Sequence, residues 1–123
     1  MFFIKIKTGL IRRPVLFEKK YLFNYELMKK LNGGKQMKDV WTGSLTKPSE
    51  KKEGKHPTQK PEYLLEKIIL ASTKEDDIIL DPFCGSGTTG VVAKKLHRKF
   101  IGFDNVNDYL EITKRRLEKI HEE

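Results

Sequence analysis

The residues with the clearest chemical potential lie between Asp81 and Gly90, in the stretch Asp-Pro-Phe-Cys-Gly-Ser-Gly-Thr-Thr-Gly. Glycines at positions 85 and 87 allow positive φ angles and let a ligand approach the backbone without meeting a Cβ atom. A helix that begins just beyond them presents unpaired N–H groups, which favour an acidic or polar ligand. Asp81 is expected to end a strand at the edge where open parallel sheets bind ligands. The stretch therefore predicts a cofactor-binding loop.

Three interpretations of this loop are open from its glycines. The first is a plain turn between a strand and a helix. The second is dinucleotide binding, because Gly85, Gly87 and Gly90 match G-x-G-x-x-G and Asp104 follows at a suitable distance for a ribose carboxylate. The third is S-adenosylmethionine. The sequence Asp-Pro-Phe-Cys-Gly-Ser-Gly-Thr-Thr resembles the cofactor motif of DNA amino-methyltransferases, which methylate adenine N6 or cytosine N4. This resemblance favours S-adenosylmethionine over NAD as the ligand.

The neighbouring sequence predicts the elements that hold this loop. The apolar run 78–80 indicates a strand, and Val92 with Leu96 indicates a helix after the loop. Residues 99–103 form a second apolar run that ends at Asp104, and a right-handed crossover makes the two strands parallel. Asp104 then reaches the ligand edge, where its carboxylate can accept both ribose hydroxyls. The alternative role for Asp104 is to cap the helix that follows.

A second polar motif precedes the predicted helix 62–71. Its sequence, residues 56–61, is His-Pro-Thr-Gln-Lys-Pro. Thr58 and Gln59 can cap that helix and bond a ligand carboxylate, and Lys60 adds a positive charge. The hexapeptide alone is typical of an ordinary helix start. It also resembles the other cofactor motif of the same family, which directly precedes the glycine loop in one permuted group, and this favours a binding role.

The net charge of +8 is unevenly distributed along the chain. Residues 1–60 contain 15 lysines and arginines against 5 acidic residues, whereas residues 61–123 contain 10 against 12. Cations interleaved with aromatic residues suit a double-stranded DNA surface, because cations displace counterions from phosphates and aromatic rings stack on exposed bases. A solvated basic face with core aromatics is an equally open interpretation.

The length of 123 residues suits one small domain. We expect three parts: a basic and aromatic remnant of a target-recognition region over 1–41, a polar linker over 42–55, and a cofactor-binding α/β part over 56–123. Further helices are expected over 25–31 and 107–120, and short extended pieces over 2–23. No run of about 18 apolar residues exists, so neither a membrane span nor a signal peptide is expected, and the expected compartment is the cytoplasm.

Cys84 is the single cysteine and cannot form an internal disulfide. No histidine pairs with it in sequence to activate a thiolate, so a small apolar filler is favoured over a nucleophile. Methylation of cytosine C5, which needs a cysteine nucleophile, is therefore disfavoured.

The resemblance implies a catalytic mechanism, and the sequence motif that this mechanism needs is missing from the chain. An exocyclic amine is a poor nucleophile, and the family assists it with a motif of Asp, Asn or Ser, then Pro-Pro, then an aromatic residue, which also stacks on the flipped base. No Pro-Pro pair occurs in this sequence. The chain therefore resembles the C-terminal part of the permuted group in which the catalytic motif comes first. Either the gene is truncated or a separate N-terminal polypeptide carries that motif.

The fold class implied by the resemblance is α/β, with a partial Rossmann-like methyltransferase sheet preceded by an irregular basic segment. The implied activity is site-specific DNA methylation, with adenine N6 favoured over cytosine N4. A non-catalytic module that binds S-adenosylmethionine or DNA is the alternative. No catalytic residue and no metal ligand is assigned. The residues expected to bind S-adenosylmethionine are His56, Thr58, Gln59, Lys60, Asp81, Phe83, Gly85, Ser86, Gly87, Thr88 and Asp104.

Overall fold

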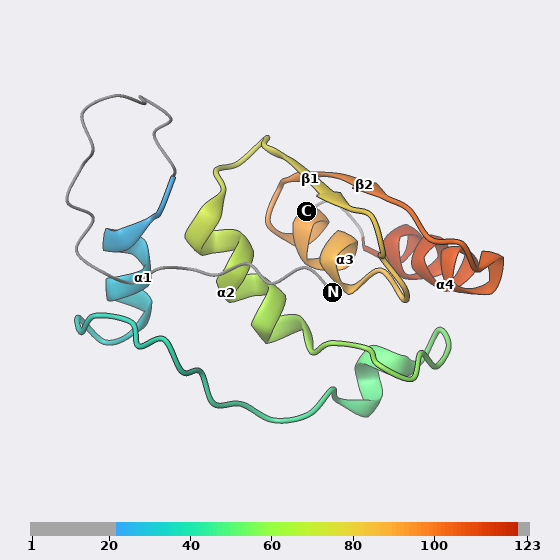
Figure 1. Cartoon of the computed structure of the whole chain (residues 1–123), viewed down its shortest axis with the longest axis horizontal. Helices are drawn as coiled ribbons and strands as arrows, with labels where there is room; N and C mark the ends of the chain where they lie inside the picture. The colour runs from blue at the N-terminus through green and yellow to red at the C-terminus, as the bar shows by residue number, and fades with distance from the viewer. Residues whose placement is uncertain (1–21, 121–123) are drawn as a thin grey trace.

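The computed structural model describes residues 22–120, so the extended pieces expected over 2–23 lie almost entirely outside the described residues. Four helices, one 3-10 helix and two strands are described (Figure 1). In chain order they are α1 (Tyr25–Leu31), η1 (Pro48–Lys51), α2 (Glu62–Ser72), β1 (Ile78–Asp81), α3 (Thr88–Lys95), β2 (Lys99–Gly102) and α4 (Asn107–Glu118).

The sheet of the described region consists of β1 and β2, which run parallel with Ile78 opposite Lys99 and Asp81 opposite Gly102. Helix α3 forms the crossover between the two strands (Figure 1). The predicted strand, loop, helix and strand order is thus confirmed, as is the α/β fold class. The helices expected over 25–31, 62–71 and 107–120 are also present, with boundaries that differ by no more than two residues.

The apolar core lies between α2, α3 and one face of the sheet. Ile69 of α2 packs with Val92 and Ala93 of α3, and all three are buried. Ile79 of β1 and Phe100 of β2 pack against this cluster from the sheet. Successive residues of a strand point to opposite faces of the sheet. Ile79 and Phe100 therefore pack against α3, and their neighbours in each strand point to the other face. The core therefore fixes which face of the sheet α3 covers.

Helix α1 is attached to the rest of the fold through α2. Met28 of α1 is 1% exposed and is the largest fully buried side chain of the described region. Just before α1, the Asn24 side chain donates hydrogen bonds to the carbonyls of Leu70, at 2.6 Å, and Thr73, at 2.9 Å. These bonds satisfy carbonyls at the C-terminal end of α2, which the helix itself leaves unpaired.

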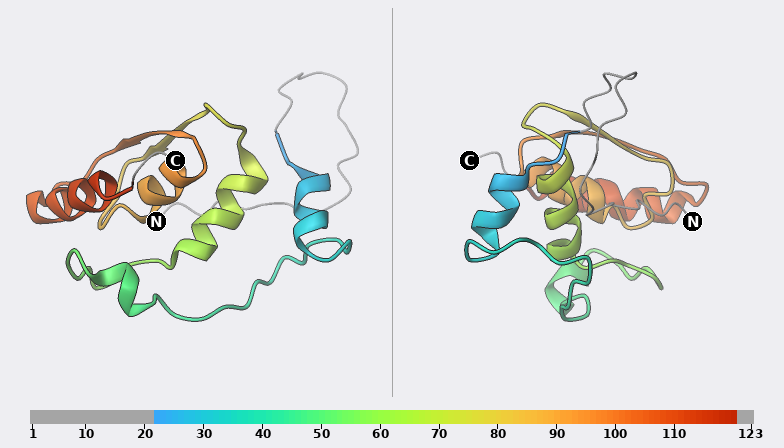
Figure 2. Two further views of the ribbon diagram at one scale, coloured as in Figure 1. Left: turned by 180° about the vertical axis from the view of Figure 1, so that it is seen from behind. Right: turned by 60° about the vertical axis from the view of Figure 1, so that its left-hand side comes forward.

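The polar segment over 42–55, expected to be a linker, contains η1. Figure 2 shows the chain passing from α1 along the side of the molecule to η1, which lies at the N-terminal end of α2. Two bonds join the end of this segment to α4: Arg115 donates to the Glu53 carbonyl at 3.1 Å, and Lys119 pairs with the Glu53 carboxylate at 2.5 Å. No helix between residues 22 and 120 is long and apolar enough to cross a membrane.

The close contact between Gly90 of α3 and Phe100 of β2 predicts that adding a methyl group at position 90 lowers the stability of the fold. A Cβ atom added at Gly90 would lie 2.6 Å from the Phe100 ring. Overpacking of a core costs about 1–3 kcal/mol, which exceeds the gain of up to about 1 kcal/mol in helix propensity. We therefore expect Gly90→Ala to lower the free energy of unfolding by about 1–2 kcal/mol in urea denaturation. Lys114→Ala, on the exposed side of α4, is the control and should change it by less than about 0.5 kcal/mol. If Gly90→Ala and Lys114→Ala had the same free energy of unfolding, the close packing of Gly90 against Phe100 would be contradicted.

Candidate functional site

Two segments that are distant in sequence meet at a pocket of about 160 Å³ at the carboxyl end of β1. Residues 56–60, which precede α2, form one wall, and the loop from β1 to α3 forms the other. The lining residues are His56, Thr58, Gln59, Lys60, Leu65, Asp81, Phe83, Cys84, Gly85, Ser86, Thr88 and Thr89. Nine of the eleven residues predicted from the sequence are thus brought together. Gly87 and Asp104 do not line the pocket.

Asp81 shapes the loop on which the pocket is built. One carboxylate oxygen accepts a hydrogen bond from the Phe83 N–H at 3.1 Å, and the other accepts one from the Thr89 hydroxyl at 2.6 Å. Asp81 is the last residue of β1, and Thr89 lies in the first turn of α3. The carboxylate therefore ties the end of the strand to the start of the helix and closes the loop between them.

Gly85 and Gly87, the two central glycines of the loop, lie too close to other side chains for a larger residue to fit. Gly85 and Gly87 have φ angles of +52° and +73°, which residues with a side chain rarely adopt. A Cβ atom at Gly85 would lie 3.0 Å from Nε2 of His56, and one at Gly87 would lie 2.5 Å from the Thr113 methyl group. His56 itself packs edge-on against Tyr109, with 4.2 Å between ring centroids. Close approach of the 56–60 segment and of α4 therefore demands glycine here.

Asp104 supports the loop from outside the pocket. One of its oxygens accepts a hydrogen bond from the Gly85 N–H at 2.9 Å, and the other accepts one from the Val106 N–H at 3.0 Å. Both oxygens thus already bind backbone. Each carboxylate oxygen has a second lone pair, so the group still has acceptor capacity for a ligand at the edge of the sheet.

The 56–60 segment is held by residues of the polar connector. The Gln59 side chain donates from Nε2 to the Glu50 backbone carbonyl at 2.8 Å, and the Gln59 backbone carbonyl accepts a hydrogen bond from the Thr46 hydroxyl at 2.9 Å. The expectation that Thr58 and Gln59 cap α2 is wrong. The Glu62 N–H at the start of α2 is instead bound by a Glu50 side-chain oxygen at 2.9 Å, because the Gln59 side chain turns towards η1. Gln59 Oε1 is buried and has no hydrogen-bond partner.

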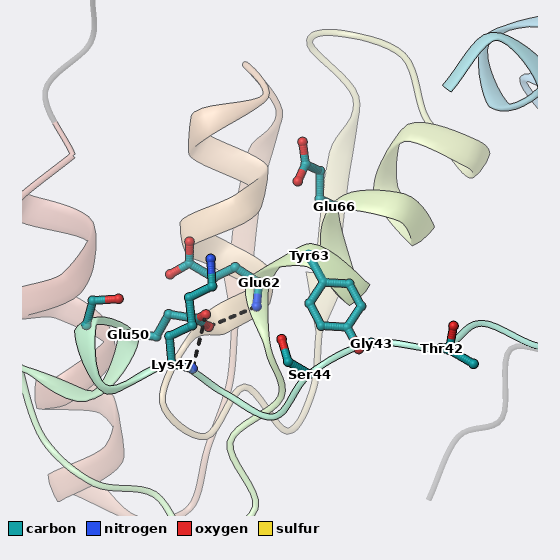
Figure 3. Close-up of a pocket in the computed structure, with 9 residues that line it drawn as sticks. Thr42, Gly43, Ser44, Lys47, Glu50, Glu62, Tyr63 and Glu66 are labelled. Atoms are coloured by element: carbon teal, nitrogen blue, oxygen red, sulfur yellow. Dashed lines mark hydrogen bonds between the residues drawn. The ribbon is translucent and has the colours of Figure 1, made fainter. Parts of the chain in front are cut away.

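A wider hollow of about 490 Å³ lies on the other side of this contact (Figure 3). Segment 42–50 and the first turns of α2 line it, and none of the predicted site residues does. In Figure 3 the Glu50 carboxylate spans from the Lys47 N–H to the Glu62 N–H. The Glu62 carboxylate is paired with Lys95 and Arg116. Two of the acidic side chains that line this hollow, those of Glu50 and Glu62, are therefore occupied by structural bonds.

A guanidinium group from α4 links the glycine loop to the N-terminal end of α2. Arg116, which is 7% exposed, donates from Nη1 to the Ser86 carbonyl at 2.8 Å and to the Thr88 hydroxyl at 3.1 Å. From Nη2 it donates to Glu62 at 3.0 Å. Thr113, one helical turn earlier, donates to the Gly85 carbonyl at 3.0 Å. Helix α4 thus anchors both the glycine loop and the N-terminal end of α2.

Sequence reasoning assigned no role to Arg116, Glu62 or Glu50, although a signal for Arg116 existed. Thr113 and Arg116 are three residues apart and therefore lie on one side of α4, with Ile112 adjacent, and all three are buried. A polar pair on the buried side of an amphipathic helix needs hydrogen-bond partners from another element. Glu50 carried no comparable signal, because it lies in a run of charged residues.

Cys84 is buried at the base of the loop. Burial raises the pKa of its thiol above the ordinary value, which outweighs the lowering effect of its hydrogen bond with Thr113, and the carboxylates of Asp81 and Asp104 raise it further. The thiol therefore stays protonated at neutral pH, as expected for an apolar filler and not for a nucleophile. Among the described residues no cluster of His, Cys, Asp and Glu is suited to hold a metal ion.

Comparison with known proteins identifies the family. The family model described as DNA methylase matches residues 12–115, which is most of the chain. The chain belongs to the DNA methylase family. This confirms the resemblance noted in the sequence.

Two curated relatives show how much of such a methylase this chain covers. Type II methyltransferase M2.LlaDCHI of Lactococcus lactis subsp. cremoris is 74% identical over 100 residues, which are 81% of this chain and 37% of the relative. Type II methyltransferase M2.DpnII of Streptococcus pneumoniae is 71% identical over 103 residues, which are 84% of this chain and 38% of the relative. The chain spans little more than a third of the length of these methylases.

Among solved structures, the M1.HpyAVI–SAM complex is 50% identical over 52% of this chain and 33% of its own, with a TM-score of 0.49.

The Glu62 ion pairs predict unequal costs for two substitutions that each remove one cation. Arg116→Met leaves Glu62, the Ser86 carbonyl and the Thr88 hydroxyl without a buried donor, so we expect a loss of about 3 kcal/mol in the free energy of unfolding. Lys95→Met removes a half-exposed partner of the same carboxylate and should cost less than about 1 kcal/mol. Chemical denaturation of both variants measures the difference. A larger loss for Lys95→Met would show that Arg116 is not the anchor.

Proposed function

We propose that this chain provides the S-adenosylmethionine-binding portion of a site-specific DNA methyltransferase, with adenine N6 as the favoured acceptor over cytosine N4. The observation that carries the proposal is the convergence of residues 56–60 with the glycine loop in one pocket. Both segments are cofactor motifs of the family by resemblance, and they are separated by α2 and β1 in the chain. Membership of the DNA methylase family supports the same reaction class.

The residues of the pocket fit the amino-acid end of S-adenosylmethionine. Lys60, which lines the pocket, offers a positive charge to a carboxylate. A Cβ atom at Gly85 would lie 3.0 Å from Nε2 of His56, so glycine at this position lets the 56–60 segment stay close to the loop. Asp104 has acceptor capacity for ribose hydroxyls, and Phe83 is 71% exposed beside the loop, where its ring can face the adenine. When bound, the cofactor supplies an electrophilic methyl group.

The volume of the described pocket suits only part of such a cofactor. Its volume of about 160 Å³ is well below the roughly 300–1,000 Å³ of typical small-molecule sites. We infer that further polypeptide completes the enclosure when the cofactor binds.

The cofactor assignment predicts selective binding. In isothermal titration calorimetry we expect the chain to bind S-adenosylmethionine and to bind NAD at least about 10-fold more weakly. Asp104→Ala should weaken S-adenosylmethionine binding by about 10- to 100-fold, because a hydrogen bond to a charged group contributes about 1.5–3 kcal/mol. Asp104→Asn is the control for loop distortion, because its single side-chain oxygen can still accept from the Gly85 N–H although the bond to the Val106 N–H is lost. Tighter binding of NAD, or unchanged affinity in Asp104→Ala, would refute the assignment.

Double-stranded DNA is the proposed substrate, and the cytoplasm is therefore the proposed compartment. The excess of 15 basic over 5 acidic residues in the first 60 positions supports an electrostatic contribution to DNA binding. A non-catalytic module of a split methyltransferase remains the second candidate. The absence of a Pro-Pro-aromatic motif from this sequence favours it for the isolated chain.

The missing motif predicts that the 123-residue chain alone transfers no methyl group to DNA. Without acceptors for the target amine and an aromatic face for the flipped base, the nucleophile is neither positioned nor activated, which should lower the rate by about five orders of magnitude or more. A tritiated methyl-transfer assay measures this, and chromatography of the digested DNA distinguishes N6-methyladenine from N4-methylcytosine. Activity should appear when a polypeptide carrying the motif is added. Sequence-specific methylation by the pure chain would contradict the proposal.

A further inference from the structure

The polar connector holds the segment that precedes α2 from two directions. The Thr46 hydroxyl donates to the Gln59 backbone carbonyl at 2.9 Å, and the Gln59 side-chain amide donates to the Glu50 backbone carbonyl at 2.8 Å. The Glu50 carboxylate accepts a hydrogen bond from the Glu62 N–H at 2.9 Å (Figure 3). We call residues 46–54 the clamp, because they hold both Gln59 and the start of α2.

The far end of the clamp is attached to α4. The Glu53 carbonyl accepts a bond from Arg115 at 3.1 Å, and the Glu53 carboxylate pairs with Lys119 at 2.5 Å. Gly54 follows with a φ angle of +148°, and a Cβ atom there would lie 2.7 Å from the buried side chain of Ile112. The clamp therefore extends from α4 to the segment that forms one wall of the pocket.

The clamp itself has little that would hold it in place without these partners. None of the four residues of η1 is buried. A 3-10 helix of this length has poorer hydrogen-bond geometry than an α-helix, and segments with few buried apolar contacts open locally at a small cost in free energy. Docking of the clamp therefore depends on its bonds to Gln59, to Glu62 and to α4.

The two walls of the pocket depend on the clamp to different extents. The glycine loop is bonded to Asp104 and to side chains of α4, which lie outside the clamp. At the start of the other wall, His56 packs against Tyr109. Gln59, near the end of that wall, is bonded to the clamp through both its backbone and its side chain. The position of Gln59, and of Lys60 next to it, therefore follows the clamp.

We propose that Glu50 is a positioning residue for the cofactor pocket, and that docking of the clamp and binding of S-adenosylmethionine reinforce each other. This inference rests on the proposed function. Thr58, Gln59 and Lys60 line the pocket, so a ligand there meets the segment that the clamp holds. A ligand that binds the docked state more tightly shifts the equilibrium towards docking, and by thermodynamic linkage docking raises the affinity for the ligand by the same factor.

Limited trypsin digestion measures docking in the unaltered chain. Lys51 and Lys52 lie at the end of η1 and are exposed, but cleavage after them requires the surrounding backbone to open locally. Saturating S-adenosylmethionine should slow this cleavage about 10-fold, which is within the usual range of coupling between sites. Cleavage after Lys35, which is exposed in the connector before the clamp, is the internal control and should keep its rate. Mass spectrometry of the fragments quantifies both.

Substitutions of Glu50 measure the reciprocal effect by calorimetry. Glu50→Ala removes the acceptor for the Glu62 N–H and should weaken S-adenosylmethionine binding about 10-fold, with faster cleavage after Lys51 in the absence of ligand. Glu50→Gln keeps a side-chain oxygen for that N–H and should bind within about 3-fold of the unaltered chain. Glu66→Ala is the matched control, because Glu66 is exposed on α2 and lines the same hollow as Glu50. It should change neither the affinity nor the cleavage.

The outcomes separate this inference from the proposed function. If the unaltered chain binds S-adenosylmethionine but cleavage after Lys51 and Lys52 keeps its rate, the coupling is refuted and the proposed function stands. The same holds if Lys35 is protected equally, or if Glu50→Ala binds as tightly as the unaltered chain. The digestion of the unaltered chain needs no substitution, so it decides the question even if Glu50→Ala fails to fold. Absence of S-adenosylmethionine binding by the unaltered chain would refute the proposed function, and this inference with it.

Discussion

The buried guanidinium of Arg116 is the interaction on which the site depends. A buried charge is tolerated when it is paired and its hydrogen bonds are satisfied, and Arg116 finds its partners on the Ser86 carbonyl, the Thr88 hydroxyl and Glu62. These partners belong to the glycine loop, to the start of α3 and to the start of α2. The glycine loop and the N-terminal end of α2 are thus positioned relative to each other by α4, the last helix of the described region.

A second constraint comes from the N-terminal end of α2. Its first N–H groups have no partner within the helix, and Glu50 of η1 satisfies the N–H of Glu62. The Glu50 backbone carbonyl also receives the side-chain amide of Gln59, so one residue holds both the helix end and the segment that enters the pocket. Composition makes residues 42–55 look like a simple linker. In the fold, part of that segment supports the proposed cofactor site by holding Gln59 and the start of α2.

Within residues 22–120, the small pocket and the sheet face that α3 does not cover have a common physical origin. An open α/β sheet binds ligands at the carboxyl ends of several strands, and a sheet of two strands can form one side of such a site. The core is correspondingly small: Ile69, Val92 and Ala93 form its buried cluster on one side of the sheet. Covering the other side would add apolar burial and would also enclose the ligand edge, so stability and binding are expected to improve together.

The sequence alone determined the order of the four helices and two strands, and their boundaries to within about two residues, because glycine-rich turns and apolar periodicity are local signals; it did not predict η1. It also indicated the family and nine of the twelve residues that line the pocket, since both motifs are continuous segments. The tertiary structure decided how the segments meet: Asp104 bonds to Gly85 instead of lining the pocket, and Glu50 caps α2 instead of Thr58 or Gln59. The bonds of Arg116, Glu50 and Asp104 join residues 12 to 54 positions apart. Contacts over such separations leave no periodic trace in a single sequence, so only the folded chain shows them.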